Sequence, residues 1–125
     1  MIIGIGSDIF EVSRIGAELK SGDDYVIREL FTDNEISYCG KMHNPERHYA
    51  VRFAAKEAVF KALGTGKISG MRWHDIEIVR DDNGAFRAQL YGSVKETAAR
   101  KMAKKVFVSV AHTRRMALAT VILES

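Results

Sequence analysis

The sequence has very little cysteine and proline. Cys39 is the only cysteine among 125 residues, which excludes an intramolecular disulfide and a metal site built from cysteines alone. A reducing compartment is therefore favoured. Pro45 is the only proline, so there is no proline-rich linker. No apolar run approaches the ~20 residues that cross a bilayer, and no basic segment precedes the apolar residues 1–7. We expect a cytoplasmic protein that does not enter a membrane.

The composition is that of an ordinary globular domain. Hydrophobic residues make up 46% and charged residues 28% of the chain, which excludes disorder and collagen-like order. A chain of this length predicts one domain over residues 1–125. The net charge of +3 permits an acidic partner and does not require nucleic acid. We expect no nucleic-acid binding.

The first half of the chain predicts one strand followed by four helices. Thr32 and Glu35 form a capping-box pattern that opens the third helix. Asn44 and Pro45 are typical of an N-cap and a first helical residue, and Gly64 is typical of the position just after a helix. The predicted elements are a strand at 2–9 and helices at 13–20, 25–31, 33–41 and 45–63.

The second half predicts a hairpin, one helix and two further strands. Asn83-Gly84 between two runs of alternating polarity is a strong hairpin signal. Ser93 and Glu96 suggest a second capping box. The predicted elements are strands at 75–80 and 85–91, a helix at 93–104, and strands at 106–111 and 116–123. Together they predict an α+β fold in which a largely antiparallel sheet packs on the long central helix.

The long helix at 45–63 places two charged residues among apolar ones. At about 100° per residue, Glu57 and Lys61 share a side with Ala50, Phe53, Ala54 and Phe60, while the polar arc contains His48, Arg52 and Lys56. Charge removed from water is costly unless it is paired or bound to a metal. Glu57 and Lys61 are either a solvated i,i+4 pair or a site in which Glu57 binds a hard cation and Lys61 contacts a phosphate.

Asp8 is a second charged residue in an unexpected position, at the end of an apolar strand. Gly4 and Gly6 precede it and mark a place where backbones can approach closely. Asp8 is either a strand-end acid or a second carboxylate ligand beside Glu57. One Asp and one Glu suit Mg²⁺, which keeps waters and binds substrate phosphates with its remaining positions.

Two further segments could contact phosphate. His112 ends a predicted strand before Thr113-Arg114-Arg115, so it is either structural or a phosphate contact beside arginines. Gly64-Thr65-Gly66-Lys67 follows a helix and lacks the spacing of a P-loop. We interpret Gly64, Thr65 and Gly66 as a helix end whose free amides border the group that Lys61 contacts.

With these residues assembled, the chain resembles the small bacterial holo-[acyl-carrier-protein] synthases, the short class of 4′-phosphopantetheinyl transferases. The resemblance extends over nearly the whole chain, and the segment 52–66 carries it most specifically. It rests on Gly4-Ile5-Gly6-Ser7-Asp8-Ile9, Glu11-Val12-Ser13-Arg14-Ile15, Phe31-Thr32-Asp33-Asn34-Glu35, Arg52-Phe53-Ala54-Ala55-Lys56-Glu57-Ala58, Lys61-Ala62-Leu63-Gly64-Thr65-Gly66, Asp75-Ile76-Glu77-Ile78 and Val108-Ser109-Val110-Ala111-His112-Thr113. Two departures are Ala111, where a serine is common, and Ala85-Phe86, where a basic residue and proline are common.

The resemblance implies an activity and a set of site residues. The reaction transfers the phosphopantetheine arm of coenzyme A to a serine hydroxyl of apo acyl carrier protein and releases adenosine 3′,5′-bisphosphate. The resemblance implies a homotrimer with coenzyme A in clefts between subunits. The implied roles are Mg²⁺ binding by Asp8 and Glu57, phosphate contact by Lys61, nucleotide contact by Arg52, His112 and Thr113, and contact of Arg14 with the acidic carrier protein.

Charge and chemistry extend these roles. Lys20 and Arg28 could steer the acidic partner together with Arg14, and Glu57 is the nearest candidate for a base that accepts the serine proton. Two other functions use the same residues. A non-catalytic module could bind carrier protein or coenzyme A without needing the carboxylates. A metal-dependent phosphohydrolase could use them with water as the nucleophile and no protein partner.

Overall fold

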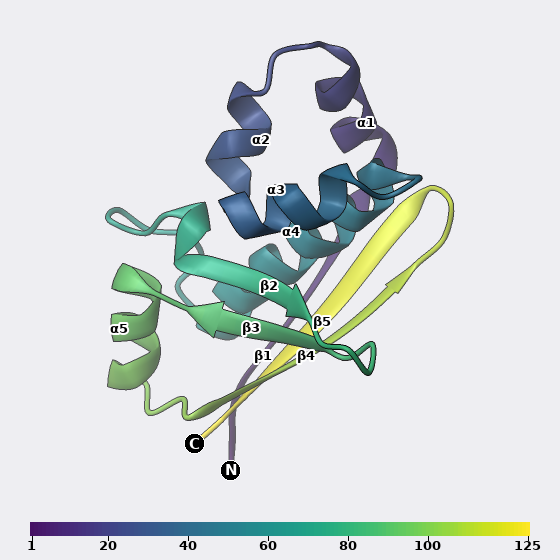
Figure 1. The fold of residues 1–125 in the computed structure, drawn as a ribbon. Helices are drawn as coiled ribbons and strands as arrows, with labels where there is room; N and C mark the ends of the chain where they lie inside the picture. Colours follow the sequence, from purple (N-terminus) through teal and green to yellow (C-terminus); the bar gives the residue numbers. More distant parts are fainter.

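The computed structural model describes all 125 residues. One long strand is followed by four helices, a hairpin, a fifth helix and a closing pair of strands (Figure 1). In chain order the elements are β1 Ile2–Glu11, α1 Val12–Lys20, α2 Tyr25–Leu30, α3 Asp33–Gly40, α4 Pro45–Ala62, the short 3₁₀ helix η1 Trp73–Asp75, β2 Ile76–Arg80, β3 Phe86–Leu90, α5 Gly92–Arg100, β4 Lys105–His112 and β5 Met116–Glu124.

The strands form two antiparallel sheets, so the predicted α+β class is confirmed while the predicted sheet is divided. The larger sheet has the order β1-β5-β4 and the smaller one pairs β2 with β3. In the larger sheet Ala119 of β5 lies between Asp8 of β1 and Val110 of β4. β1 and β4 are therefore the two edge strands, and the chain termini meet at one end of this sheet (Figure 1).

Helix α4 lies at the centre of the fold, as predicted. It packs on β1 and β5 of the larger sheet, and α1, α2 and α3 lie on its other side (Figure 1). The helix is nearly surrounded because small residues dominate its buried surface. Four alanines spaced four residues apart are buried along one stripe, namely Ala50, Ala54, Ala58 and Ala62. Such a stripe lets a neighbouring backbone approach closely.

The close neighbour is the glycine-containing part of β1, as the sequence predicts. A Cβ atom at Gly4 would overlap the carbonyl oxygen of Ala62. A Cβ atom at Gly6 would overlap the carbonyl oxygen of Ala58 and lie 2.6 Å from the amide nitrogen of Ala62. Only glycine fits at both positions, because main-chain atoms cannot move aside as a flexible side chain can. This contact fixes β1 against the last two turns of α4.

Helix ends show which capping predictions hold. The capping box of Thr32 and Glu35 is present, with the Glu35 N–H donating to Thr32 Oγ1 at 3.2 Å and the Thr32 N–H donating to Glu35 Oε1 at 2.9 Å. Pro45 begins α4, but Asn44 makes no capping hydrogen bond with its side chain. Gly64 follows the end of α4 with φ of +80°, the left-handed conformation expected there.

The predicted capping box at Ser93 is wrong. Helix α5 begins at Gly92, one residue earlier, and no side chain caps it. Ser93 is therefore inside the helix, where its carbonyl accepts a hydrogen bond from Thr97 Oγ1 at 2.9 Å. The N–H of Tyr91 donates to the carbonyl of Asp75 at 2.7 Å, so backbone pairing, not a side-chain cap, leads the chain from β3 into α5. The helix also ends earlier than predicted, at Arg100.

The β2–β3 hairpin is confirmed, with a longer loop than Asn-Gly alone. Arg80 pairs with Phe86, so five residues connect the strands. The Gly84 N–H donates to Asp81 O, and the Asp81 N–H donates to Ala85 O, both at 2.8 Å. Gly84 has φ of +88°, a conformation that favours glycine.

The predicted polar arc of α4 is wrong. Arg52 and Lys56 are 1% and 0% exposed, whereas Lys61, which was placed among apolar residues, has a side chain that is 52% exposed. The reason is tertiary, because α3 and β2 cover the Arg52 and Lys56 side of the helix. Glu57 is half-buried beside β1. The side of α4 that was predicted to face solvent therefore contains buried charges, whereas Glu57 and Lys61 lie at the edge of the core.

We predict that Gly6→Ala lowers the free energy of unfolding by about 3 kcal/mol, the upper end of the typical cost of overpacking, because the main-chain atoms that the new Cβ meets cannot move aside. Urea denaturation followed by circular dichroism measures this. The matched control is Gly16→Ala in α1, where a Cβ meets nothing within 4 Å; it should raise stability by about 0.5–1 kcal/mol. Equal stabilities for Gly6→Ala and the wild type would contradict the packing described above.

Candidate active site

Asp8, Glu57 and Lys61 come together where the end of β1 crosses α4. Lys61 Nζ donates to Asp8 Oδ1 at 2.8 Å and to the carbonyl of Ser7 at 3.0 Å. The Asp8 side chain is 17% exposed and that of Lys61 52% exposed. Glu57 lies one helical turn before Lys61 on the same side of α4. Two carboxylates and one ammonium group therefore share a site that solvent can reach.

The electrostatics of this cluster couple its members. Burial raises the pKa of Glu57 above its ordinary value of 4.5, the negative charge of Asp8 raises it further, and the charges of Lys61 and Arg14 oppose the change. The hydrogen bond to Asp8 raises the pKa of Lys61. Repulsion between two carboxylates favours the binding of a cation or a proton between them.

The donor set fits a hard divalent cation that is shared with substrate. Asp8 and Glu57 offer only carboxylate oxygens, which Mg²⁺ prefers, and Mg²⁺ sites commonly use one or two carboxylates together with waters and phosphates. No group of three or more His, Cys, Asp or Glu side chains is placed to hold a metal ion. The geometry therefore does not suit a structural zinc site, which needs four protein ligands.

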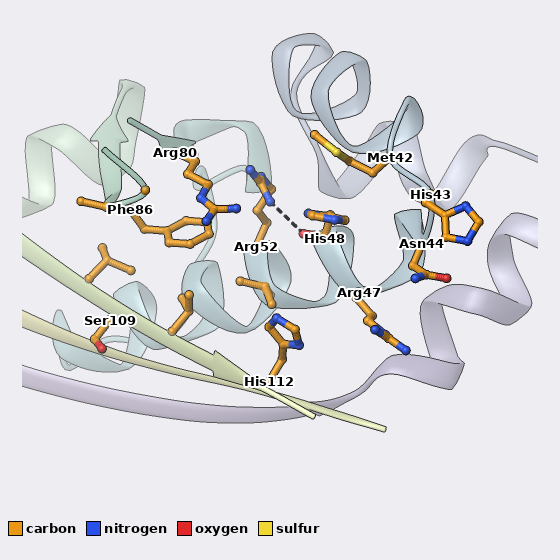
Figure 2. Close-up of a pocket in the computed structure, with 15 residues that line it drawn as sticks. Met42, His43, Asn44, Arg47, His48, Arg52, Arg80, Phe86, Ser109 and His112 are labelled. Carbon is orange, nitrogen blue, oxygen red and sulfur yellow. Dashed lines mark hydrogen bonds between the residues drawn. The ribbon is translucent and has the colours of Figure 1, made fainter. Parts of the chain in front are cut away.

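A basic pocket lies on the other side of α4, toward β4. It has a volume of about 660 Å³ and contains Arg52 and His112, two of the residues expected near a nucleotide. Figure 2 shows Arg52, Arg80 and Phe86 next to one another, with His112 reaching toward the pocket from β4. No carboxylate lines it; the other lining residues are Met42, His43, Asn44, Arg47, His48, Val51, Gly84, Ala85, Val108, Ser109 and Val110.

The pocket concentrates positive charge around an aromatic ring. The guanidinium carbons of Arg52 and Arg80 lie 5.5 and 5.6 Å from the centre of the Phe86 ring. Arg52 donates to the carbonyl of His48 at 3.1 Å (Figure 2), while its buried Nε has no hydrogen-bond partner. Burial lowers the pKa of His48, and the charges of Arg52 and Arg80 lower it further. A pocket of this kind favours an anionic ligand.

The acidic cluster and the basic pocket lie toward opposite edges of the larger sheet. Asp8 belongs to the edge strand β1 and His112 to the edge strand β4, with β5 between them. Helix α4 lies over the sheet and separates the two groups, and none of Asp8, Glu57 and Lys61 lines the basic pocket. The residues predicted for metal and nucleotide binding therefore form two separate groups within one chain.

The remaining predicted ligand residues lie in two turns. Gly64 and Gly66, with φ of +80° and +65°, form the turn after α4, and Thr65 Oγ1 donates to Gly66 O at 2.8 Å. The expectation of free amides is wrong for both glycines, because the Gly64 amide donates to Lys61 O at 3.0 Å and the Gly66 amide to Phe60 O at 3.3 Å. This turn begins three residues after Lys61. Thr113 lies in the β4–β5 turn, where its Oγ1 accepts hydrogen bonds from the amides of Arg115 and Met116.

The three basic residues predicted to meet a partner do not form one patch. Arg14 lies over the Phe10 ring at 4.9 Å, and its charge reaches Glu57. Lys20 ends α1. Arg28 belongs to α2 and forms a 2.7 Å ion pair with Asp24. The structure groups Lys20 with Arg114 and Arg115, all lining a groove between α1 and the β4–β5 turn.

Sequence reasoning missed several residues of the basic pocket. Arg47 and His48 follow Pro45 in the first turns of α4, and Arg80 and Phe86 face each other as the last pair of the hairpin. The register of the hairpin was the available signal, because cross-strand partners share one face of a sheet. The sequence could not show that this face lies beside α4.

Comparison with known proteins defines the family. Residues 4–120 match the 4′-phosphopantetheinyl transferase superfamily. The chain belongs to this superfamily, and none of its helices is both long enough and apolar enough to pass through a bilayer.

The similar proteins narrow the class further. A holo-[acyl-carrier-protein] synthase of Geobacter sulfurreducens is 40% identical over 124 residues, covering 99% of this chain and 98% of the relative. A crystal structure of holo-[acyl-carrier-protein] synthase from Neisseria meningitidis superposes with a TM-score of 0.88 at 30% identity over 100% of both chains. The Helicobacter pylori synthase in complex with coenzyme A has a TM-score of 0.82 at 28% identity, covering 96% of this chain and 99% of that one. The fold and the resemblance expected from the sequence are confirmed.

We predict that Asp8→Asn lowers the pKa of Glu57. The substitution removes the negative charge that raises this pKa. Because the folded-state pKa of Glu57 is above 4.5, its ionisation reduces stability as the pH rises through that value, and Asp8→Asn should reduce this loss. Carboxyl ¹³C shifts followed against pH measure the pKa. Glu96→Gln, at an exposed position of α5, should leave it unchanged, and an unaltered Glu57 pKa in Asp8→Asn would show that the two acids are not coupled.

Proposed function

We propose that this chain is a holo-[acyl-carrier-protein] synthase, which transfers 4′-phosphopantetheine from coenzyme A to a serine hydroxyl of apo acyl carrier protein. The observation that carries the proposal is the meeting of Asp8, Glu57 and Lys61 at the crossing of β1 and α4, in a chain that belongs to the phosphopantetheinyl transferase superfamily. Its products are holo acyl carrier protein and adenosine 3′,5′-bisphosphate, and the reaction takes place in the cytoplasm.

Asp8 and Glu57 are the residues that would hold Mg²⁺. Bound there, Mg²⁺ would supply positive charge that offsets the negative charge of the pyrophosphate. One carboxylate oxygen of Asp8 accepts a hydrogen bond from Lys61, and the other is left for an additional ligand. Lys61 is half-exposed, so its ammonium group can turn from Asp8 to a phosphate oxygen of the substrate, where it stabilises the charge that develops in the transition state.

Glu57 is the base in this proposal. The serine oxygen forms a bond to the phosphorus that carries the pantetheine, and the bond from this phosphorus to the leaving phosphate oxygen breaks. The serine proton passes to Glu57, directly or through one water.

The outer face of the larger sheet supports assembly into a homotrimer. Four large apolar side chains on the three strands are exposed, namely Ile5 at 65%, Ile9 at 62%, Phe107 at 50% and Leu118 at 43%. Large apolar side chains gathered on one exposed face of a sheet mark an interaction surface. We assign it to two further copies of this chain, which bury the three sheets against one another.

Assembly would also complete the active site. The acidic cluster and the basic pocket lie toward opposite edges of one sheet, so a cyclic arrangement brings the β4 edge of one copy to the β1 edge of the next. The reacting pyrophosphate then lies beside Asp8, Glu57 and Lys61 of one subunit. The nucleotide and its 3′-phosphate lie in the pocket with Arg52 and His112 of its neighbour.

The acidic carrier protein approaches along α1. Arg14 lies near enough to Glu57 for its charge to lower the pKa of that group, so a partner bound to Arg14 presents its serine beside the acidic cluster. Lys20, at the end of α1, lies in the groove with Arg114 and Arg115 and attracts the acidic partner from a separate position. Arg28 is engaged with Asp24 and contributes less attraction, because a paired charge is partly cancelled.

Mass spectrometry of the carrier tests the proposal. Incubation with coenzyme A, Mg²⁺ and apo carrier should add the phosphopantetheine mass. Glu57→Gln and Asp8→Asn should each lower turnover at least ~100-fold, in line with lost transition-state charge stabilisation. Lys61→Ala should weaken the binding of coenzyme A and reduce turnover.

The control and the contrary results are equally specific. Glu96→Gln removes an exposed carboxylate from α5 and should transfer at the wild-type rate. Carrier binding without a mass change would indicate a non-catalytic module. Coenzyme A breakdown in the absence of carrier would indicate a phosphohydrolase. Normal turnover of Glu57→Gln at saturating Mg²⁺ would remove Glu57 from the mechanism.

We predict that Ile5→Lys yields monomers and abolishes transfer, because three lysines buried in an apolar interface repel one another and lose their water. Sedimentation equilibrium measures the mass. The control is Ile68→Lys, since Ile68 is 48% exposed in the loop after α4 and outside the sheet. A trimeric Ile5→Lys variant with normal activity would refute the assignment of the sheet face.

A further inference from the structure

A buried ion pair joins α4 to α3 on the side covered by β2. Lys56 Nζ lies 2.7 Å from Glu35 Oε1, and the two side chains are 0% and 1% exposed. Burying two charges costs several kcal/mol per ion unless the geometry and hydrogen bonding are nearly complete. No step of the proposed reaction uses Lys56 or Glu35, so the position of this pair has to be explained in another way.

Both members of the pair are fully hydrogen-bonded, and the partners of Lys56 are informative. Glu35 accepts from the main-chain amides of Thr32 at 2.9 Å and Ile78 at 2.8 Å. Lys56 Nζ donates to the carbonyls of Leu30 at 2.8 Å and Trp73 at 3.1 Å. An ammonium group has three donors, and here two of them hold main-chain carbonyls. Lys56 therefore attaches two distant segments of backbone to α4.

Trp73 directly follows the loop that leaves α4. This loop, residues 63–72, contains three glycines with positive φ, Gly64, Gly66 and Gly70. One main-chain hydrogen bond lies within the loop, from the Met71 amide to Ile68 O at 3.0 Å, while the Gly66 amide donates back to Phe60 O of α4 at 3.3 Å. A glycine-rich segment loses much conformational entropy when it is ordered. Its order depends on how its two ends are fixed.

The two ends are held by different forces. The first end continues directly from α4, two residues after Lys61. At the other end, the Trp73 ring packs on Phe53 and Phe60 with ring centres 5.0 and 5.4 Å apart, contacts whose geometry is less strict than that of a hydrogen bond. The hydrogen bond from Lys56 to Trp73 O is directional, and together with the Arg72 N–H that donates to Asp75 Oδ2 at 3.1 Å it fixes the register of the chain at this end.

We propose that Lys56 is a positioning residue for the loop 63–72, and that it pre-organises the main chain of Gly64, Thr65 and Gly66 to bind coenzyme A. The ligand in this inference rests on the proposed function. By holding Trp73 O, Lys56 closes the loop on α4 before the substrate arrives, so binding does not have to supply the ordering entropy. A merely structural pair would affect stability and leave the loop and the KM for coenzyme A unchanged.

The test compares Lys56→Met with Val121→Ala, which removes buried apolar volume from β5 in the larger sheet. Both are studied at a temperature where each is fully folded by near-UV circular dichroism. Lys56→Met should raise the KM for coenzyme A about 10-fold, equivalent to ~1.4 kcal/mol of lost pre-organisation. The KM for carrier protein should not change. Val121→Ala should leave both constants as in the wild type.

Hydrogen exchange gives a readout that needs no substrate. The amides of Gly66 and Met71 should exchange about 10-fold faster in Lys56→Met, because they exchange by local opening of the loop. They should be unchanged in Val121→Ala, because a loss of global stability does not alter local opening. This measurement reports on the loop even if the wild-type chain transfers nothing, so failure of the inference and failure of the proposed function can be told apart.

A second variant covers the case in which unpaired Glu35 prevents Lys56→Met from folding. Glu35→Gln with Lys56→Met removes both charges, still lacks the donor to Trp73 O, and should show the same faster loop exchange and higher KM for coenzyme A. Wild-type exchange at Gly66 and Met71, or a KM for coenzyme A within about 2-fold of the wild type, in either folded variant would overturn the inference.

Discussion

The contact between the glycines of β1 and the alanine stripe of α4 is the constraint on which the site depends. Because Gly4 and Gly6 have no side chain, the strand lies directly on the main chain of Ala58 and Ala62. Asp8 follows two residues later along the strand, at the height of Lys61. Residues separated by some fifty positions in the sequence therefore meet within hydrogen-bond distance. A wider spacing between strand and helix would separate them.

The charged residues of helix α4 lie in three different environments. Glu57 and Lys61 lie at the edge of the core beside β1, where a substrate can reach them. Arg52 opens into a basic pocket with an unpartnered nitrogen. Lys56 is completely enclosed and satisfied by Glu35 and two carbonyls. Because one rigid helix presents all of them, the acidic cluster, the basic pocket and the loop after α4 keep fixed positions relative to one another.

Much of the local structure could be predicted from the sequence. The capping box at Thr32, the left-handed glycine after α4 and the hairpin around Gly84 all depend on residues within a few positions of one another. The same approach failed at Ser93, where the pairing of Tyr91 with the distant Asp75 carbonyl begins the helix instead. A capping motif predicts a helix start only when no tertiary hydrogen bond competes with it.

The sequence by itself determined the order of the elements, the glycines at the β1–α4 contact and the residue types of a metal and phosphate site. Only the tertiary structure decided which side of α4 is exposed to solvent. It reversed the expectation that Arg52 and Lys56 are exposed. A helical wheel records angles about one axis and contains nothing about the segments that cover each side. Capping, turns and periodicity are local properties of the chain, whereas burial of charge depends on neighbours that are distant in sequence, here α3 and β2.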